Sequence, residues 1–252
     1  MTTNQIITKL LKTAKNPLPE SKKTINFLIL TIKSKIYEAL KIKSFFKVYE
    51  GHDKLLDCLK QKKGGFFVEC GGNNGKSYDP TYYLEKIMEW EGIIIEPLPV
   101  YKQCAKIRKK SEIYNCALVA DDFPEKTISI MNCKMMSIIK GEEGYERWIK
   151  NGEKVQNIKA EELVVAADTL NNVLENYFLT HKMRNINLLV IDVECSEINV
   201  LKGFDLNKYK PEKILIEIQD QYKKNFVDSY LKSNYKLISR IGYNDYLYEL
   251  NT

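Results

Sequence analysis

The 252-residue sequence has few histidines and no Cys-x-x-Cys pair. It has two histidines, and its six cysteines stand singly at positions 58, 70, 104, 116, 133 and 195. Disulfide-rich secreted domains and structural zinc sites need cysteines or histidines at short, regular spacings. The sequence indicates neither kind of site. Scattered single cysteines are typical of a reducing compartment, so we expect a cytoplasmic protein.

Long hydrophobic runs are also missing. The most apolar segment, INFLILTI at 25–32, is far shorter than the roughly 20 residues that cross a bilayer, so we expect no transmembrane segment. Residues 22–46 have apolar side chains at helical spacing with lysines between them, which predicts an amphipathic helical region. We expect residues 1–60 to form a helical N-terminal appendage that caps the domain. A homodimer contact, a substrate contact and a peripheral membrane contact through 22–46 are the alternatives.

Basic and aromatic residues are interleaved only over short stretches, such as KIKSFFKVY at 41–49. The 39 lysines and arginines exceed the 33 acidic residues by a net charge of +6, which makes the surface only mildly basic. Proteins that bind RNA or DNA usually concentrate basic residues, with aromatic side chains on which bases stack. We therefore expect no nucleic-acid partner.

Short apolar runs alternate with helical stretches in the rest of the chain. The predicted strands are 65–69, 92–96, 113–119, 186–194 and 213–219, followed by a predicted hairpin over 235–250. Strands that alternate with helices form parallel sheets. The sequence therefore predicts one α/β domain over 61–252, with a Rossmann-like sheet of parallel strands closed by an antiparallel C-terminal hairpin. A segment at about 121–165 interrupts this alternation and is predicted to form a flap over the strand ends.

The stretch ECGGNNGKS, residues 69–77, follows the first predicted strand and resembles a phosphate-binding loop. A P-loop has its first glycine five residues before Gly75, where this chain has Cys70. The dinucleotide-binding fingerprint lacks a glycine at the same position. In favour of a P-loop are Lys76, Ser77 and an acid, Asp192, after an apolar strand. A nucleoside-triphosphatase is therefore one alternative.

Two acids at strand ends fit a different ligand. Glu69 ends the first predicted strand and Glu96 ends the second, while Gly71 and Gly75 let the backbone approach a ligand. A carboxylate at position 96 can accept both hydroxyls of a ribose, and an acid at position 69 can face a cation but would repel a triphosphate. The pattern favours a cofactor with a ribose and little negative charge, which describes S-adenosylmethionine.

Five segments resemble, in order, the motifs of the FkbM-type methyltransferases. They are FFVECGGNNG, IIIEPLPVYKQ, AADTLNNVLE, NLLVIDVECSEINVLKGF and PEKILIEIQ, all within residues 65–219. The resemblance implies a class I methyltransferase fold, S-adenosylmethionine as donor, and methyl transfer to a hydroxyl of a sugar or another small molecule. The implied cofactor-binding residues are Glu69, Gly71, Asn73, Gly75, Glu96, Pro97, Ala117 and Asp192.

The segments depart from the family pattern at four positions. Cys195 stands where the family has glycine, Ser196 replaces a small apolar residue, Asn171 replaces an acid, and Glu69 replaces the usual aspartate. These departures leave a third alternative, a non-catalytic cofactor-binding interaction module.

Acidic residues gather where the fourth and fifth predicted strands end. Asp192, Glu194 and Glu197 follow the fourth strand, and Glu217 lies in the fifth. An alcohol acceptor must be aligned with the methyl group and must lose its proton. We predict Asp192 or Glu194 as general base or metal ligand and Glu197 as a positioning group. A divalent metal on Asp192 and Glu217, which would lower the pKa of the acceptor hydroxyl, is the alternative to a simple base.

Overall fold

The computed structural model describes residue 49, residues 51–142 and residues 144–251. All of these belong to the second of two compact units, which comprise residues 1–47 and 48–252. The helical region predicted over 22–46 lies outside the described residues.

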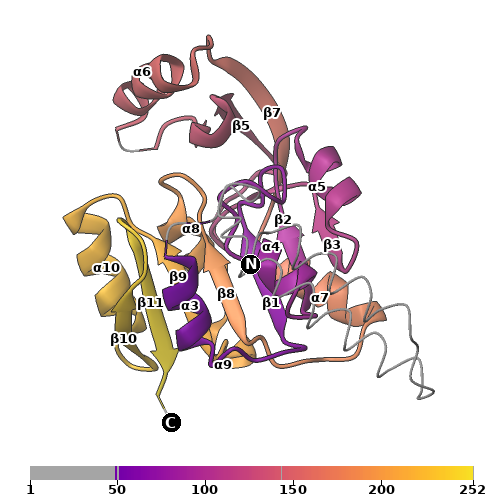
Figure 1. Cartoon of the computed structure of the whole chain (residues 1–252). Coiled ribbons are helices and arrows are strands. Elements are labelled where there is room, and N and C mark those ends of the chain that lie inside the picture. The colour runs from indigo at the N-terminus through magenta and orange to yellow at the C-terminus, as the bar shows by residue number, and fades with distance from the viewer. Residues whose placement is uncertain (1–48, 50, 143, 252) are drawn as a thin grey trace, which may run out of the picture. The chain divides into compact units, whose positions relative to one another are not determined.

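A seven-stranded sheet forms the centre of the described unit (Figure 1). The strand order is β10-β11-β9-β8-β1-β2-β3. Strands β3, β2, β1, β8 and β9 run parallel, and β11 and β10 continue the sheet as an antiparallel hairpin beside β9. This arrangement confirms the predicted class of fold. The bounds are β1 Phe66–Cys70, β2 Glu91–Ile95, β3 Ser111–Tyr114, β8 Leu188–Ile191, β9 Lys213–Glu217, β10 Tyr235–Arg240 and β11 Asp245–Leu250.

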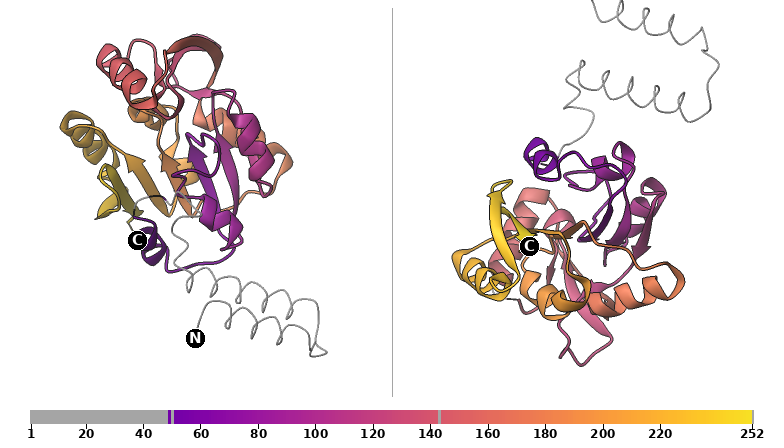
Figure 2. Two further views of the ribbon diagram at one scale, coloured as in Figure 1. Left: turned by 45° about the horizontal axis from the view of Figure 1, so that its top comes forward. Right: turned by 90° about the horizontal axis from the view of Figure 1, so that it is seen from below.

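Helices cover both faces of this sheet (Figure 2). One face packs against α3 His52–Cys58, α4 Tyr82–Lys86 and α5 Tyr101–Ile107. The other packs against α7 Leu170–Thr180, α8 Glu197–Lys202, α9 Leu206–Tyr209 and α10 Gln221–Leu231. Both faces of the central strands are therefore buried, which explains why their sequences are continuous apolar runs.

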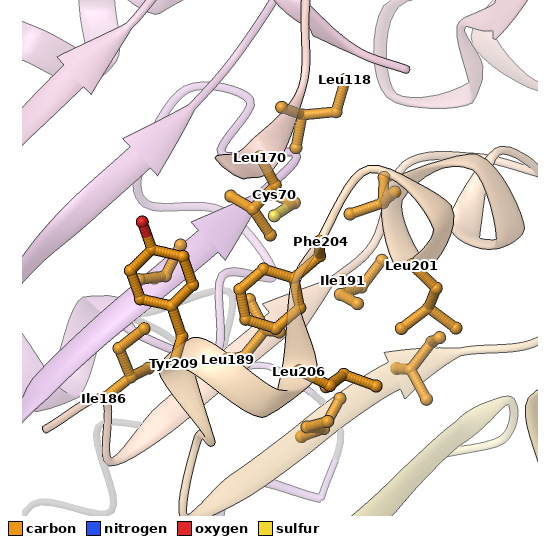
Figure 3. Close-up of a cluster of buried hydrophobic side chains, with 14 of the residues drawn as sticks. Cys70, Leu118, Leu170, Ile186, Leu189, Ile191, Leu201, Phe204, Leu206 and Tyr209 are labelled. Atoms are coloured by element: carbon orange, nitrogen blue, oxygen red, sulfur yellow. The ribbon is translucent and has the colours of Figure 1, made fainter. Parts of the chain in front are cut away.

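Alternation along β1 distributes its side chains between the two faces. Phe66 and Val68 belong to the larger core beside α7 to α10, whereas Phe67 belongs to the core beneath α3 to α5. Figure 3 shows part of the larger core, in which Leu189 and Ile191 of β8 pack near Phe204. By the same alternation Glu69 falls on the α4 and α5 side, inside the protein.

The strand predicted over 113–119 is wrong as a single element. The structure divides it between β3, which pairs with β2, and β4 Ala117–Leu118, which pairs with β7 Glu161–Asp168 in a second sheet. Between them the Asn115 side chain donates hydrogen bonds to the carbonyl oxygens of Glu96, at 2.8 Å, and Pro97, at 2.9 Å. This side chain takes the place of a backbone ladder, so the chain leaves the main sheet there.

The second sheet contains most of the segment predicted as a flap. Its strand order is β4-β7-β5-β6, with β5 Thr127–Asn132 and β6 Ile138–Ile139 antiparallel to each other. The same segment also contains the short helix η2 Lys134–Met136 and the helix α6 Tyr145–Gln156. In Figure 1 the second sheet lies beyond one end of the main sheet. A small apolar cluster of Leu98, Ala117 and Ile130 joins the two sheets. We call residues 121–165 the flap.

Within the described part of the chain, no helix combines the length and apolarity that a bilayer crossing needs.

Candidate active site

A crevice opens at the carboxyl ends of β1, β2 and β8. The chain runs from β1 to β2 and β3 on one side and returns to β8 and β9 on the other, so the strand order reverses between β1 and β8. Open α/β sheets bind their ligands at such a reversal. The crevice has an empty volume of about 980 Å³, part of which is open to solvent. The flap contributes Ile130, Lys134, Met135, Ser137 and Ile139 to its wall.

Most of the residues predicted to bind the cofactor line this crevice. They are Glu69, Gly71, Asn73, Glu96, Pro97, Ala117 and Asp192. Gly75 is not among the lining residues, because its Cα packs against Cys104 of α5. An added Cβ at Gly75 would lie 2.7 Å from Cys104 Sγ. Of the predicted catalytic residues, Asp192 and Glu194 line the crevice, and Glu197 lies behind it.

Gly71 permits the loop after β1 to touch the end of β8. Its φ of +96° is a conformation that other residues rarely adopt, and an added Cβ would lie 1.7 Å from the Asp192 carbonyl oxygen. The Gly71 amide donates to the Ile95 carbonyl at 2.9 Å. This glycine therefore joins the ends of β1, β2 and β8 into one wall of the crevice.

Glu96 holds the geometry expected of a ribose-binding carboxylate. It is 5% exposed. Its Oε2 accepts from the Asn73 amide at 2.7 Å, and its Oε1 accepts from the Leu98 amide at 2.8 Å. A carboxylate oxygen can accept two hydrogen bonds, so each oxygen keeps one acceptor position for a ribose hydroxyl. Burial raises the pKa of Glu96 to about 7, although the two amides oppose that rise.

The cation beside Glu69 is the buried side chain of Arg108. Its carboxylate accepts from Thr81 Oγ1 at 2.7 Å and lies 3.6 Å from the Arg108 guanidinium. Sequence reasoning expected a cationic group beside Glu69 and assigned it to the ligand. It missed Arg108, because no local spacing relates the end of α5 to the end of β1.

The amides that a P-loop would direct at phosphate are already bonded. Asn74 Oδ1 accepts from the Lys76 amide at 3.0 Å and from the Ser77 amide at 2.9 Å. Asn74 Nδ2 also donates to Ser77 Oγ at 3.1 Å. Phosphate cradles require such amides to point at the ligand. The loop geometry therefore disfavours a bound triphosphate.

Three carboxylates form an acid cluster at the ends of β8 and β9. Asp192, Glu194 and Glu217 each offer an oxygen, and these oxygens all lie within 4.8 Å of one another. Burial and the Asp192 charge raise the pKa of Glu217 to about 11. Burial, with Asp192 and Glu197 nearby, also raises the pKa of Glu194 well above its usual range.

Asp192 and Glu217 share a hydrogen bond in this cluster. Burial raises the pKa of Asp192, but the hydrogen bond that Glu217 donates opposes the rise. Because the pKa of Glu217 is about 11, Glu217 holds the shared proton at neutral pH, and the accepting oxygen of Asp192 is the candidate general base. With all three carboxylates ionised, the same oxygens could instead hold a divalent cation. The structure brings together Asp192, Glu194 and Glu217, which the sequence analysis named as possible metal ligands.

A buried clamp shapes the turn that carries Glu194. Glu194 and Cys195 have φ values of +52° and +83°, which cost side-chain-bearing residues free energy. Glu197 Oε1 accepts from the Cys195 amide at 3.0 Å, and Lys223 Nζ donates to the Cys195 carbonyl at 2.5 Å. Lys223 Nζ also lies 3.7 Å from Glu197 Oε2. Glu197 and Lys223 thus hold a turn that would be relaxed if glycine stood at position 195.

We expect Lys223→Met to destabilise the protein by about 3–5 kcal/mol, because it leaves Glu197 as a buried, unpaired charge. Adding Cys195→Gly should return about 1–2 kcal/mol, because glycine adopts the left-handed turn without strain. Urea unfolding of the two variants measures both changes. Lys140→Met is the control, since Lys140 pairs with Glu162 and both side chains are about half exposed, so its loss should cost less than about 1 kcal/mol. Equal stability of the Lys223 and Lys140 variants would contradict the role given to Lys223.

Comparison with known proteins adds a family and two structures. The model of the methyltransferase FkbM domain matches residues 69–244. A solved structure of methyltransferase FkbM from Methylobacillus flagellatus KT is 14% identical with a TM-score of 0.44, covering 74% of this chain but 43% of that one. A SAM-dependent methyltransferase from Aquifex aeolicus is 11% identical with a TM-score of 0.41, covering 81% of this chain and 90% of the other. No curated protein gave a match.

Proposed function

The chain belongs to the FkbM family of S-adenosylmethionine-dependent methyltransferases, and we propose that it transfers the methyl group to a hydroxyl oxygen of a small polar or glycan-related acceptor. One observation carries this proposal. A single crevice is lined both by Glu96, which suits a ribose, and by Asp192 and Glu194 of the acid cluster, which suit an acceptor proton. Ribose binding alone would suit many cofactors, whereas the acid cluster supplies the chemistry that an alcohol requires.

The residues of the crevice fit S-adenosylmethionine. Glu96 would accept the ribose hydroxyls, and Leu98, Ala117 and Leu118 would form the apolar wall beside the adenine. The bound cofactor supplies an electrophilic methyl group on a positively charged sulfur. Asp192 lines the same crevice, where the negative charge of a carboxylate would favour a sulfonium.

Asp192 would accept the acceptor's proton while the new bond forms. It would hold the acceptor hydroxyl in the crevice and take up the hydroxyl proton when the cofactor's methyl group is transferred. Glu217, already protonated, would keep the charge of the cluster low until that step. The alternative is a divalent metal on the acid cluster, which would lower the pKa of the acceptor hydroxyl and leave Asp192 as a ligand.

The acceptor class, location and contacts of the protein are part of the proposal. A small hydroxyl compound suits a crevice that the flap lines on one side, and a nucleic-acid partner is not part of the proposal. A cytoplasmic location agrees with the scattered cysteines, which are all unpaired in the described residues. Homodimer or peripheral membrane contacts through 22–46 concern residues outside the described part of the chain.

Isothermal titration tests the cofactor assignment directly. We expect S-adenosylmethionine and S-adenosylhomocysteine to bind, and ATP with magnesium not to bind. Lys76→Ala should leave both sulfur compounds bound as before, since Lys76 is not among the residues that line the crevice. Binding of ATP alone would favour a nucleoside-triphosphatase. Binding of the cofactor without methyl transfer to any of a panel of hydroxyl compounds would favour a non-catalytic module.

The affinity for S-adenosylmethionine should fall as the pH drops below about 7. In the free protein the pKa of Glu96 is about 7, and its ionised form accepts hydrogen bonds from the ribose better than its protonated form. Below this pH the dissociation constant should therefore rise by up to about tenfold per pH unit. Titrations at pH 5.5 to 8.5 measure the change, and Glu96→Gln should remove it. An affinity that is the same at both ends of the range would contradict the role of Glu96.

A further inference from the structure

Arg108 forms the centre of a buried polar cluster under the loop after β1. Its side chain is fully buried. Nε donates to Glu85 at 2.9 Å, Nη1 donates to Asp79 at 2.6 Å, and Nη2 donates to Thr81 Oγ1 at 2.6 Å. The fourth polar partner, Glu69, lies 3.6 Å from Nη1. We call these five residues the arginine cluster.

The cluster ties down both ends of the segment 75–81. At one end Arg108 Nη1 donates to the Gly75 carbonyl at 3.4 Å. At the other, Asp79 Oδ1 accepts from the amides of Thr81, at 2.8 Å, and Tyr82, at 2.7 Å, where α4 begins. Between these points Ser77, Tyr78, Asp79 and Pro80 line the crevice. Arg108 therefore contacts the side of segment 75–81 that faces the protein interior, and the opposite side of the segment lines the crevice.

Arg108 is the central cation of this region. Burial and Asp79 raise the pKa of Glu69, whereas Arg108 lowers it. Without the guanidinium, Glu69, Asp79 and Glu85 would face one another with Lys86, which lies near Glu85 at the edge of the cluster, as a cation. A guanidinium donates from three nitrogens spread over a plane, whereas all the donors of lysine are on one nitrogen and cannot reach the same partners. The segment 75–81 therefore depends on arginine itself at this position.

We propose that Arg108 is a positioning residue for the methionine part of S-adenosylmethionine. This proposal rests on the proposed function. The nucleoside is assigned to Glu96 and to the apolar wall from β2 and β4, so the loop after β1 remains for the amino-acid part. Arg108 does not line the crevice. It holds segment 75–81 in the shape that receives that part of the cofactor.

The test compares two ligands in the wild type and in variants of Arg108, Arg184 and Thr81. S-adenosylhomocysteine contains both parts of the cofactor, whereas adenosine contains only the nucleoside. In isothermal titration we expect Arg108→Lys to weaken S-adenosylhomocysteine at least about tenfold and to change adenosine binding less than about threefold. Arg184→Met is the matched control, because Arg184 pairs with Glu91 on the surface and lies over the Phe66 ring. It should change neither ligand.

A milder variant keeps the test decisive if Arg108→Lys does not fold. Thr81→Val removes one partner of Arg108, keeps the side-chain shape, and should weaken S-adenosylhomocysteine by about threefold to tenfold. The proposal is overturned if the folded variants bind S-adenosylhomocysteine as the wild type does, or if both ligands weaken equally. Wild-type protein that binds neither ligand would instead refute the proposed cofactor, which separates the two failures.

Discussion

Asp192→Asn is expected to slow methyl transfer by about 10²- to 10⁴-fold and to leave the binding of S-adenosylhomocysteine, which carries no sulfonium charge, nearly unchanged. The amide keeps the size and one acceptor oxygen of the side chain, but it cannot take up the acceptor's proton. The rate of S-adenosylhomocysteine formation, measured with an acceptor found in the hydroxyl panel, gives the first quantity. Isothermal titration gives the second. Asp57→Asn, an exposed change in α3, is the control and should alter neither. Unchanged turnover in Asp192→Asn would refute its assignment.

Glu217→Gln separates a general base from a metal site. Glu217 is already protonated at neutral pH, since its pKa is about 11, and glutamine resembles a protonated carboxyl group. If Asp192 acts as a base, Glu217→Gln should retain most of the activity and EDTA should have no effect. If the acid cluster holds a metal, Glu217→Gln and Glu194→Gln should both lose activity, and EDTA should abolish it in the wild type.

Glu96→Ala is expected to weaken S-adenosylmethionine binding by about 1.5–3 kcal/mol, the range for hydrogen bonds to a charged group. The change removes the two proposed ribose contacts and also releases the Asn73 amide, which Glu96 now holds. Titration at pH 8, where Glu96 is ionised, measures the loss. Thermal unfolding of the free variant shows whether the loop after β1 is disturbed.

Adenine provides the control for this variant. Because adenine has no ribose, its binding should be nearly equal in the wild type and in Glu96→Ala. An unchanged affinity for S-adenosylmethionine in the variant would show that Glu96 ends β2 without binding a ligand.

Most strands of the main sheet could be predicted, because a buried parallel strand is a short apolar run between turns. The exception, 113–119, has the same composition, but Asn115 ends its pairing with β2. An asparagine ends a strand in this way only if carbonyl groups lie within reach of its side-chain amide. Those carbonyls, at Glu96 and Pro97, belong to another strand end.

The acids of the site could be predicted from the sequence for a related reason. In a parallel sheet the residues that end neighbouring strands converge at one edge, so Glu96, Asp192 and Glu194 meet once the strand order is established. Their protonation states could not be predicted from the sequence. Burial and the closeness of the two carboxyl groups set the pKa values of Glu217 and Asp192, and no spacing in the sequence expresses either cause.

The sequence by itself determined the class of fold and the acids at the strand ends, because both depend on the order of residues along short segments. Only the tertiary structure decided what those acids contact. It placed Arg108 against Glu69, brought the flap to one wall of the crevice, and set Lys223 behind the turn at Cys195. These contacts join segments far apart in the chain, and their strength comes from burial, which exists only after the segments have packed together.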